Sequence, residues 1–179
     1  MIKKVLVAIG GFVAITVATI LILAAAKPDT FRLARSIEVK APPAKIAPLI
    51  ADFHQWPQWS PYEKMVPMER SYGGAPSGQG AIYTWNDDAK VGSGRMEIVE
   101  AAPTRIAIKL DFSKPFEAHN MAEFTLDPKG DTTNLTWAMS GPLTYFFKIV
   151  HTVFSMDDMV GKDFEAGLAS LKALAEQQP

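Results

Sequence analysis

The residues best suited to acid–base or metal chemistry in this chain are its three histidines, His54, His119 and His151. They lie far apart, and neither H-x-x-x-H nor H-E-x-x-H occurs, so we predict no metal site. The chain contains no cysteine, which excludes disulfides, thiolate ligands and cysteine nucleophiles. His119 is out of phase with the apolar residues around it, and we expect it to face solvent rather than to act as a base.

The other chemical patterns point away from an assembled catalytic group. Neither a G-x-S-x-G elbow nor a G-x-x-x-x-G-K-S/T phosphate loop is present, and we predict no cofactor. Arg95 and Glu97 share one face of a predicted strand, where they form either an acid–base pair or, as is commoner, a surface ion pair. No residue is therefore predicted to be catalytic.

Asn120 is the polar residue whose placement is most informative. It alternates with Ala118, Ala122 and Phe124, so its side chain points to the same apolar interior as theirs. A buried carboxamide needs hydrogen-bond partners. Either a backbone group supplies them, or Asn120 orients the polar head of a bound ligand, because apolar pockets carry a few placed polar groups.

Alternating apolar and polar residues predict the strands that position these side chains. The clearest is 104–112, in which Ile106, Ile108, Leu110 and Phe112 face one way. Short connections rich in Gly, Pro, Asn and Asp separate the segments, which implies antiparallel hairpins. The predicted strands are 31–40, 66–72, 81–86, 94–100, 104–112, 117–126 and 133–139.

Helical segments flank this run of strands. A short helix over 45–51 precedes an aromatic, proline-punctuated segment at 53–61. After the last strand we predict an apolar helical connector over 143–154, and then a long helix that begins near Ser155 and ends near Ala175. Its apolar stripe must cover the large apolar face of the sheet. We therefore predict an α+β fold in which a curved antiparallel sheet of about seven strands wraps on the long C-terminal helix.

An uncharged segment over residues 5–26 stands apart from this domain. At about 1.5 Å per residue, a helix over it is roughly 33 Å long, enough to cross a hydrocarbon core. Pro28 ends that helix just beyond the span. We predict two parts: residues 1–27, an N-terminal transmembrane anchor, and residues 28–179, one globular domain.

The alternative to an anchor is a cleaved signal peptide, since Ala24-Ala25-Ala26 resembles a cleavage site. The apolar core of a signal peptide is usually about 7–15 residues, which favours the anchor. Lys3 and Lys4 precede the span and favour a cytoplasmic N-terminus, although Lys27 and basic residues of the first strand lie at the other end. We expect a single-pass protein of the cell membrane with an extracytoplasmic, periplasmic domain.

Three stretches of the domain are similar to those of a known superfamily. The first stretch, IEVKAPPAKI (37–46), resembles the superfamily's first strand where it runs through a proline into the first helix. The second, DFHQWPQWSP (52–61), resembles the superfamily's aromatic segment. The third, GKDFEAGL (161–168), resembles part of its closing helix. On these residues the chain resembles the START-like, helix-grip (SRPBCC) superfamily, and within it the polyketide cyclase/dehydrase and lipid transport type. The resemblance implies a helix-grip fold whose cavity, between sheet and long helix, holds an apolar or amphipathic small molecule; it implies no single reaction.

The predicted lining of that cavity combines large rings, methionines and one amide. The rings of Trp56, Phe146 and Phe154 are expected to complete an aromatic interior, and most of the aromatic residues are more commonly simply core. The small residues Ala118 and Ala122 leave volume beside the rings, which favours a cavity. The predicted ligand-binding residues are Trp59, Trp85, Phe112, Asn120, Trp137, Met139, Phe147, Met156, Met159 and Val160.

Three functions stay open at this point. The one we expect is a membrane-tethered binding protein for a hydrophobic or lipid-like small molecule. The second is a polyketide cyclase/dehydratase-like or hydrolase-like enzyme, for which Asn120, Glu97 and His119 are candidates. The third is a non-catalytic envelope module that binds another protein through an exposed apolar patch in 143–154. The net charge of −1 and the lack of a basic cluster argue against nucleic acid as a partner.

Overall fold

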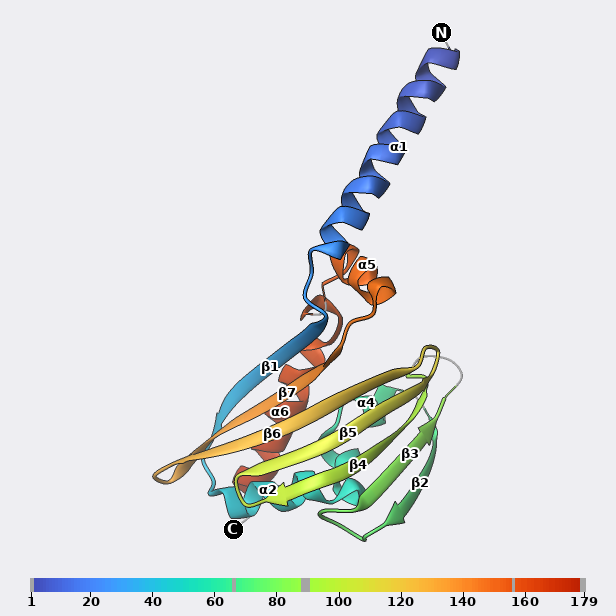
Figure 1. Cartoon of the computed structure of the whole chain (residues 1–179). Helices are drawn as coiled ribbons and strands as arrows, with labels where there is room; N and C mark the ends of the chain where they lie inside the picture. The colour runs from blue at the N-terminus through green and yellow to red at the C-terminus, as the bar shows by residue number, and fades with distance from the viewer. Residues whose placement is uncertain (1, 66, 88–90, 156, 178–179) are drawn as a thin grey trace.

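Seven antiparallel strands form one sheet in the computed structural model, which describes residues 2–65, 67–87, 91–155 and 157–177 (Figure 1). The spatial order is β1-β7-β6-β5-β4-β3-β2, so each hairpin of β2 to β7 pairs neighbours in sequence and β1 closes on β7. The α+β prediction is confirmed. The strands are β1 Thr30–Val39, β2 Glu69–Gly74, β3 Ala81–Asn86, β4 Ser93–Ala102, β5 Arg105–Lys114, β6 Ala118–Lys129 and β7 Thr132–Pro142.

The strands differ from their predicted bounds mainly at turns. Pro128 was expected in a turn, but it pairs with Thr133, and the hairpin turns instead at Gly130, whose φ is +61°. β2 begins at Glu69 and includes Gly73 and Gly74, which were expected in a loop; Val66, at the start of the predicted strand, lies outside the described residues. Edge strands tolerate such residues because one side makes no ladder bonds.

The short helices between β1 and β2 and the long C-terminal helix, α6, lie on one side of the sheet (Figure 1). The predicted C-terminal helix is present, and its first turn is a π-helix, η2, that runs directly into α6. Arg35 of β1 binds Asp157 and Glu165, and its guanidinium occupies the space where a side chain at Gly161 would stand. The helices after β1 are α2 Pro43–Ala51, η1 Phe53–Gln55, α3 Trp56–Trp59, α4 Tyr62–Met65, α5 Tyr145–Val153, η2 Asp157–Gly161 and α6 Lys162–Gln177.

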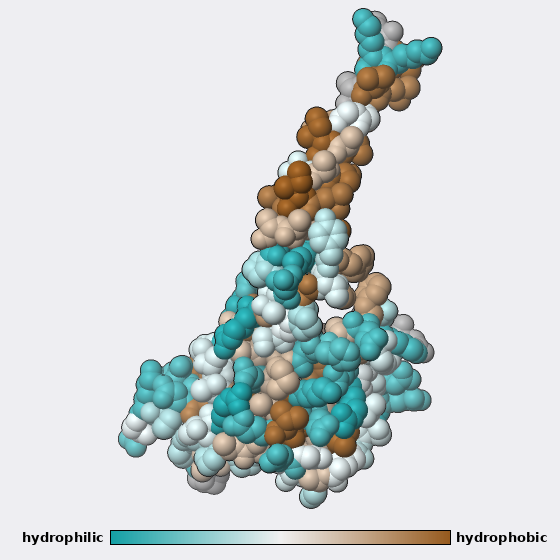
Figure 2. All heavy atoms as spheres, in the orientation of Figure 1, coloured by the Kyte–Doolittle hydropathy of each residue, from teal (hydrophilic) through white to brown (hydrophobic). Residues whose placement is uncertain are grey.

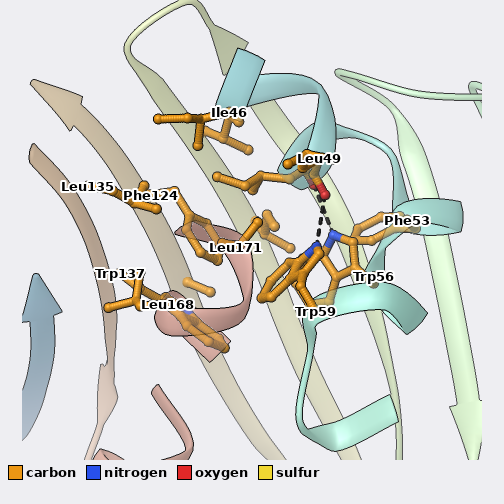
Figure 3. Packing of buried hydrophobic residues seen from close by; sticks show 14 of the residues in the cluster. Ile46, Leu49, Phe53, Trp56, Trp59, Phe124, Leu135, Trp137, Leu168 and Leu171 are labelled. Carbon is orange, nitrogen blue, oxygen red and sulfur yellow. Dashed lines mark hydrogen bonds between the residues drawn. The ribbon is translucent and has the colours of Figure 1, made fainter. Parts of the chain in front are cut away.

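The centre of the core, between the sheet and α6, is filled by stacked rings (Figure 3). Trp137 of β7 stacks on Phe164 of α6 with ring centroids 4.0 Å apart and an interplanar angle of 7°. Trp59 packs edge-on against Trp137 at 5.6 Å, and its Nε1–H donates to the carbonyl oxygen of Leu49 at 2.9 Å. The core residues lie between Leu33 and Ala175, so the domain carries its own core without the N-terminal helix.

The N-terminal helix α1, Ile2–Ala25, projects away from the domain at the end where β1 begins (Figure 1). Among the described residues it is the one helix long and apolar enough to cross a membrane by length and composition, a test that signal sequences also pass. Thr16 and Thr19 hydroxyls donate to the carbonyl oxygens four residues earlier. Their polar groups are therefore satisfied within the helix.

Candidate functional site

The structure divides the predicted ligand-binding residues into an inner and an outer group. Trp59, Trp85 and Trp137 are the inner group, with 1%, 5% and 3% of their surface exposed. Met156 lies outside the described residues, as does the side chain of Met159. The outer group, all half-buried, consists of Phe112, Asn120, Met139, Phe147 and Val160.

The inner group belongs to the packed core. Trp59 and Trp137 contact each other as described above, and Trp85 packs edge-on against Phe112 at 5.5 Å. The Trp85 ring lies directly over Gly94, where a Cβ would stand 2.5 Å from its Cη2 atom. The indole nitrogens of Trp85 and Trp137 are nonetheless buried without a hydrogen-bond partner among the described residues. Such buried donors are uncommon in folded proteins.

Three members of the outer group, Phe112, Asn120 and Met139, lie on the helix-facing side of the sheet, and the other two, Phe147 and Val160, belong to α5 and η2. Asn120 lies opposite Leu110 of β5, on the same face as Ala122 and Phe124, so the prediction that it points inward agrees with the register. Its Oδ1 atom lies where a Cβ of Gly141 would stand, beside the ring of Phe31. Only glycine at position 141 leaves room for this carboxamide.

The Asn120 carboxamide makes no hydrogen bond with another described residue of the protein. Its neighbours are mostly apolar: Met139 pairs with Ala122 and Leu33 across the sheet, and the ring of Phe31 meets His151 edge-on at 6.0 Å. Burial and the nearby Lys27 charge lower the pKa of His151, which favours its neutral form. A half-buried, mostly apolar region with an amide that bonds no other described residue is suited to an amphipathic molecule.

Two of the three candidates for catalysis, Glu97 and His119, lie on the face of the sheet opposite to that of the third, Asn120. Arg95 Nη2 and Glu97 Oε2 form an ion pair at 2.7 Å with about a third of each side chain exposed, which confirms the surface interpretation. His119 Nδ1 lies 2.7 Å from Asp111 Oδ1, and 61% of the His119 side chain is exposed. The hydrogen bond to Asp111 raises the pKa of His119. Neither group reaches the helix-facing side.

A buried carboxylate, Glu63, was not predicted from the sequence. Its Oε1 accepts from the Tyr83 hydroxyl at 2.5 Å and its Oε2 from Arg70 Nε at 2.6 Å, with 3% of the side chain exposed. Burial, and then the bond to Glu63, raise the pKa of Tyr83. Both carboxylate oxygens are occupied, so the cluster joins α4 to β2 and β3 and offers no free acid.

Two hollows open on the outside of the helical layer, with volumes of about 300 Å³ and 340 Å³. The first is lined by Leu49, Asp52 and Ser77 among others, and the second by Trp59 and Lys64 among others. Trp59 is the one predicted ligand-binding residue at either of them. Within the described ranges, no three His, Asp or Glu side chains are grouped to hold a metal ion.

The sheet, the long closing helix and their order along the chain define an α+β protein of the helix-grip type. Residues 30–176 match the sequence profile of the family described as polyketide cyclase / dehydrase and lipid transport, and the chain belongs to that family. No curated protein matches the chain significantly. The family fold is one that binds hydrophobic ligands.

Solved structures agree on the fold at low sequence identity. A protein from Chromobacterium violaceum is 18% identical with a TM-score of 0.58, and the match covers 85% of this chain and 100% of that one. The Zhui aromatase/cyclase from Streptomyces sp. R1128 is 17% identical with a TM-score of 0.58, covering 83% and 94%. The Aha1 dimer from Colwellia psychrerythraea is 13% identical with a TM-score of 0.59, covering 82% and 97%. At these identities the likeness is one of fold.

Proposed function

We propose that this protein binds a hydrophobic or lipid-like small molecule and is tethered to the membrane by α1. The observation that carries the proposal is the outer group around Asn120: a free amide beside half-buried apolar side chains, in a family whose fold binds hydrophobic ligands. The ligand's polar head would bond the Asn120 carboxamide. Its apolar part would lie against Phe112, Met139, Phe147 and Val160.

In this proposal the inner group forms the bottom of the binding site. The packed rings of Trp59 and Trp137 limit how deep a ligand reaches, while the free indole nitrogen of Trp85 is a donor that a longer ligand would satisfy. The predicted contributions of Met156 and Met159 remain part of the proposal, since methionine side chains adapt to apolar ligands.

The proposed tether is a single-pass anchor over residues 5–26, with the domain on the extracytoplasmic, periplasmic side of the cell membrane. The length of α1 and the two lysines before the span support it. A tethered domain cannot travel far from the bilayer, which favours a ligand drawn from the membrane over a freely diffusing metabolite. A reporter fused after Pro179 that is active only in the cytoplasm would contradict this orientation.

Binding is tested by titrating the domain over residues 28–179 with a dansyl-labelled fatty acid and following its fluorescence. The domain suits this experiment because it contains the whole core. The proposal predicts saturable binding of one probe per chain, displaced by unlabelled fatty acid. Fluorescence that rises without saturation, or that unlabelled fatty acid leaves unchanged, would contradict it.

A further inference from the structure

Five large apolar side chains are exposed at the end of the domain from which α1 leaves, and we call them the aromatic patch. The expectation that Phe146 and Phe154 are interior is wrong: they are 54% and 62% exposed. The rings of Phe116, in the β5–β6 connection, and Phe146, on α5, lie 5.6 Å apart. The aromatic patch consists of Phe116, Tyr145, Phe146, Val153 and Phe154.

The aromatic patch adjoins the last turns of α1. The Tyr145 hydroxyl donates to the carbonyl oxygen of Leu21 at 3.0 Å, and Lys148 of α5 forms an ion pair with Asp29, just after α1. The backbone N–H of Leu143 also donates to the carbonyl oxygen of Asp29 at 2.7 Å. Figure 2 shows the brown surface of α1 continuing as tan atoms along the side where Figure 1 places α5. The patch is therefore held at a fixed height along α1.

That height follows from helix geometry. Leu21 precedes Lys27 by six residues, or about 9 Å along a helix axis. The polar region of one leaflet is roughly 5–7 Å thick, being half the difference between the whole bilayer and its hydrocarbon core. With Lys27 at the outer surface of the bilayer, Leu21 therefore lies roughly 2–4 Å inside the boundary of the hydrocarbon core. Tyr145, bonded to Leu21, lies at the same depth.

We propose that the aromatic patch is a second membrane contact, in which α5 lies along the boundary between headgroups and acyl chains. Tyrosine and other aromatic side chains favour that depth, and short amphipathic helices bind there through an apolar face. The inference rests on the proposed tether. Together, α1 and the patch hold the domain in one orientation, with the outer group around Asn120 facing the bilayer as the entrance for a lipid-like ligand.

The test uses the full chain in phosphatidylcholine vesicles. Because the chain has no cysteine, single cysteines can be labelled with the fluorophore NBD without side reaction. Three variants are compared: Phe146→Cys in the patch, Ile15→Cys in α1, and Lys129→Cys at the β6–β7 turn, which lies far from α1 (Figure 1). Quenching is measured with a lipid spin-labelled near its headgroup, with a lipid spin-labelled deep in its acyl chain, and with aqueous iodide.

The proposal predicts that the shallow spin label quenches the Phe146 position at least about twofold more than the Lys129 position. The deep label should quench the Ile15 position. If Ile15 is quenched while Phe146 behaves as Lys129 does, the tether holds and the patch proposal is wrong. A Phe146 label that is shielded from iodide yet not quenched by lipid indicates a protein partner and also overturns it. If Ile15 is not quenched by lipid, the tether fails and the patch proposal fails with it.

Discussion

Replacing Asn120 by alanine should weaken ligand binding while leaving the protein as stable as before. The carboxamide bonds no other described residue, so its removal should change the free energy of unfolding by less than about 0.5 kcal/mol. In the complex, the lost hydrogen bond is worth about 0.5–1.5 kcal/mol net, because the half-buried site lets water replace part of it. That range corresponds to a Kd about 2- to 12-fold higher.

The assay is the dansyl fatty acid titration of the domain over residues 28–179, combined with urea unfolding. Asn134→Ala is the matched control, because Asn134 is also half-buried on the same sheet but lies on the opposite face, between Glu38 and Asp127. Its Kd should equal that of the wild type. An Asn120→Ala variant that binds the probe normally but loses about 1 kcal/mol or more of stability, on the order of a lost buried hydrogen bond, would show that the amide is structural and does not bind the ligand.

Three more outcomes follow from the contacts. Tyr83→Phe should lower the free energy of unfolding by about 1.5–3 kcal/mol in urea titrations, because it removes a buried hydrogen bond to the Glu63 carboxylate. Gly94→Ala should cost about 1–3 kcal/mol by the same measurement and shift tryptophan fluorescence, since its Cβ would collide with an indole ring. The pKa of His119, followed by NMR, should lie above 6.5 and should fall in the Asp111→Asn variant. Because the pKa of His119 is raised in the folded protein, its pairing with Asp111 stabilises the fold fully below pH 6.5. That stabilisation is lost as the pH rises through the pKa of the folded state. An unchanged His119 pKa in Asp111→Asn would contradict that pairing.

The strands were predictable from the sequence because each one has one buried and one solvent-facing side. Segment 104–112 shows this: Ile106 and Ile108 are buried, and Lys109, the next residue and on the opposite face, is exposed. Strand ends were less predictable. Pro128 continues its strand because the tight turn at Gly130 brings Thr133 opposite it, and such pairing is not visible in one segment taken alone.

The site was predictable only in part, since periodicity gives the face of a residue and not its depth. It placed Asn120 on the correct face, but it did not separate the packed Trp137 from the half-buried Met139 two residues later. The role of Arg35 could have been predicted, because Arg35 is a single charged residue on the apolar face of β1. In the structure it forms ion pairs with Asp157 of η2 and Glu165 of α6. No such pattern marked Glu63, because its partners lie on two other elements.

Phe146 was misplaced for a different reason. Apolar composition indicates that a side chain avoids water, and an interior was the expected place for it. A lipid bilayer that contacts the protein surface also shields an apolar side chain from water. The exposure of Phe146 beside α1 is therefore consistent with the proposed tether and would be unusual on a freely soluble surface.

Whether this chain carries a lipid-like molecule in the site around Asn120 can be measured by native mass spectrometry of the full chain purified from its membranes into nanodiscs. One hydrophobic small molecule should be retained per chain, and at least about tenfold less in Asn120→Trp, whose larger ring would fill the site. No retained molecule in the wild type, or equal amounts in the wild type and Asn120→Trp, would contradict the proposed ligand binding.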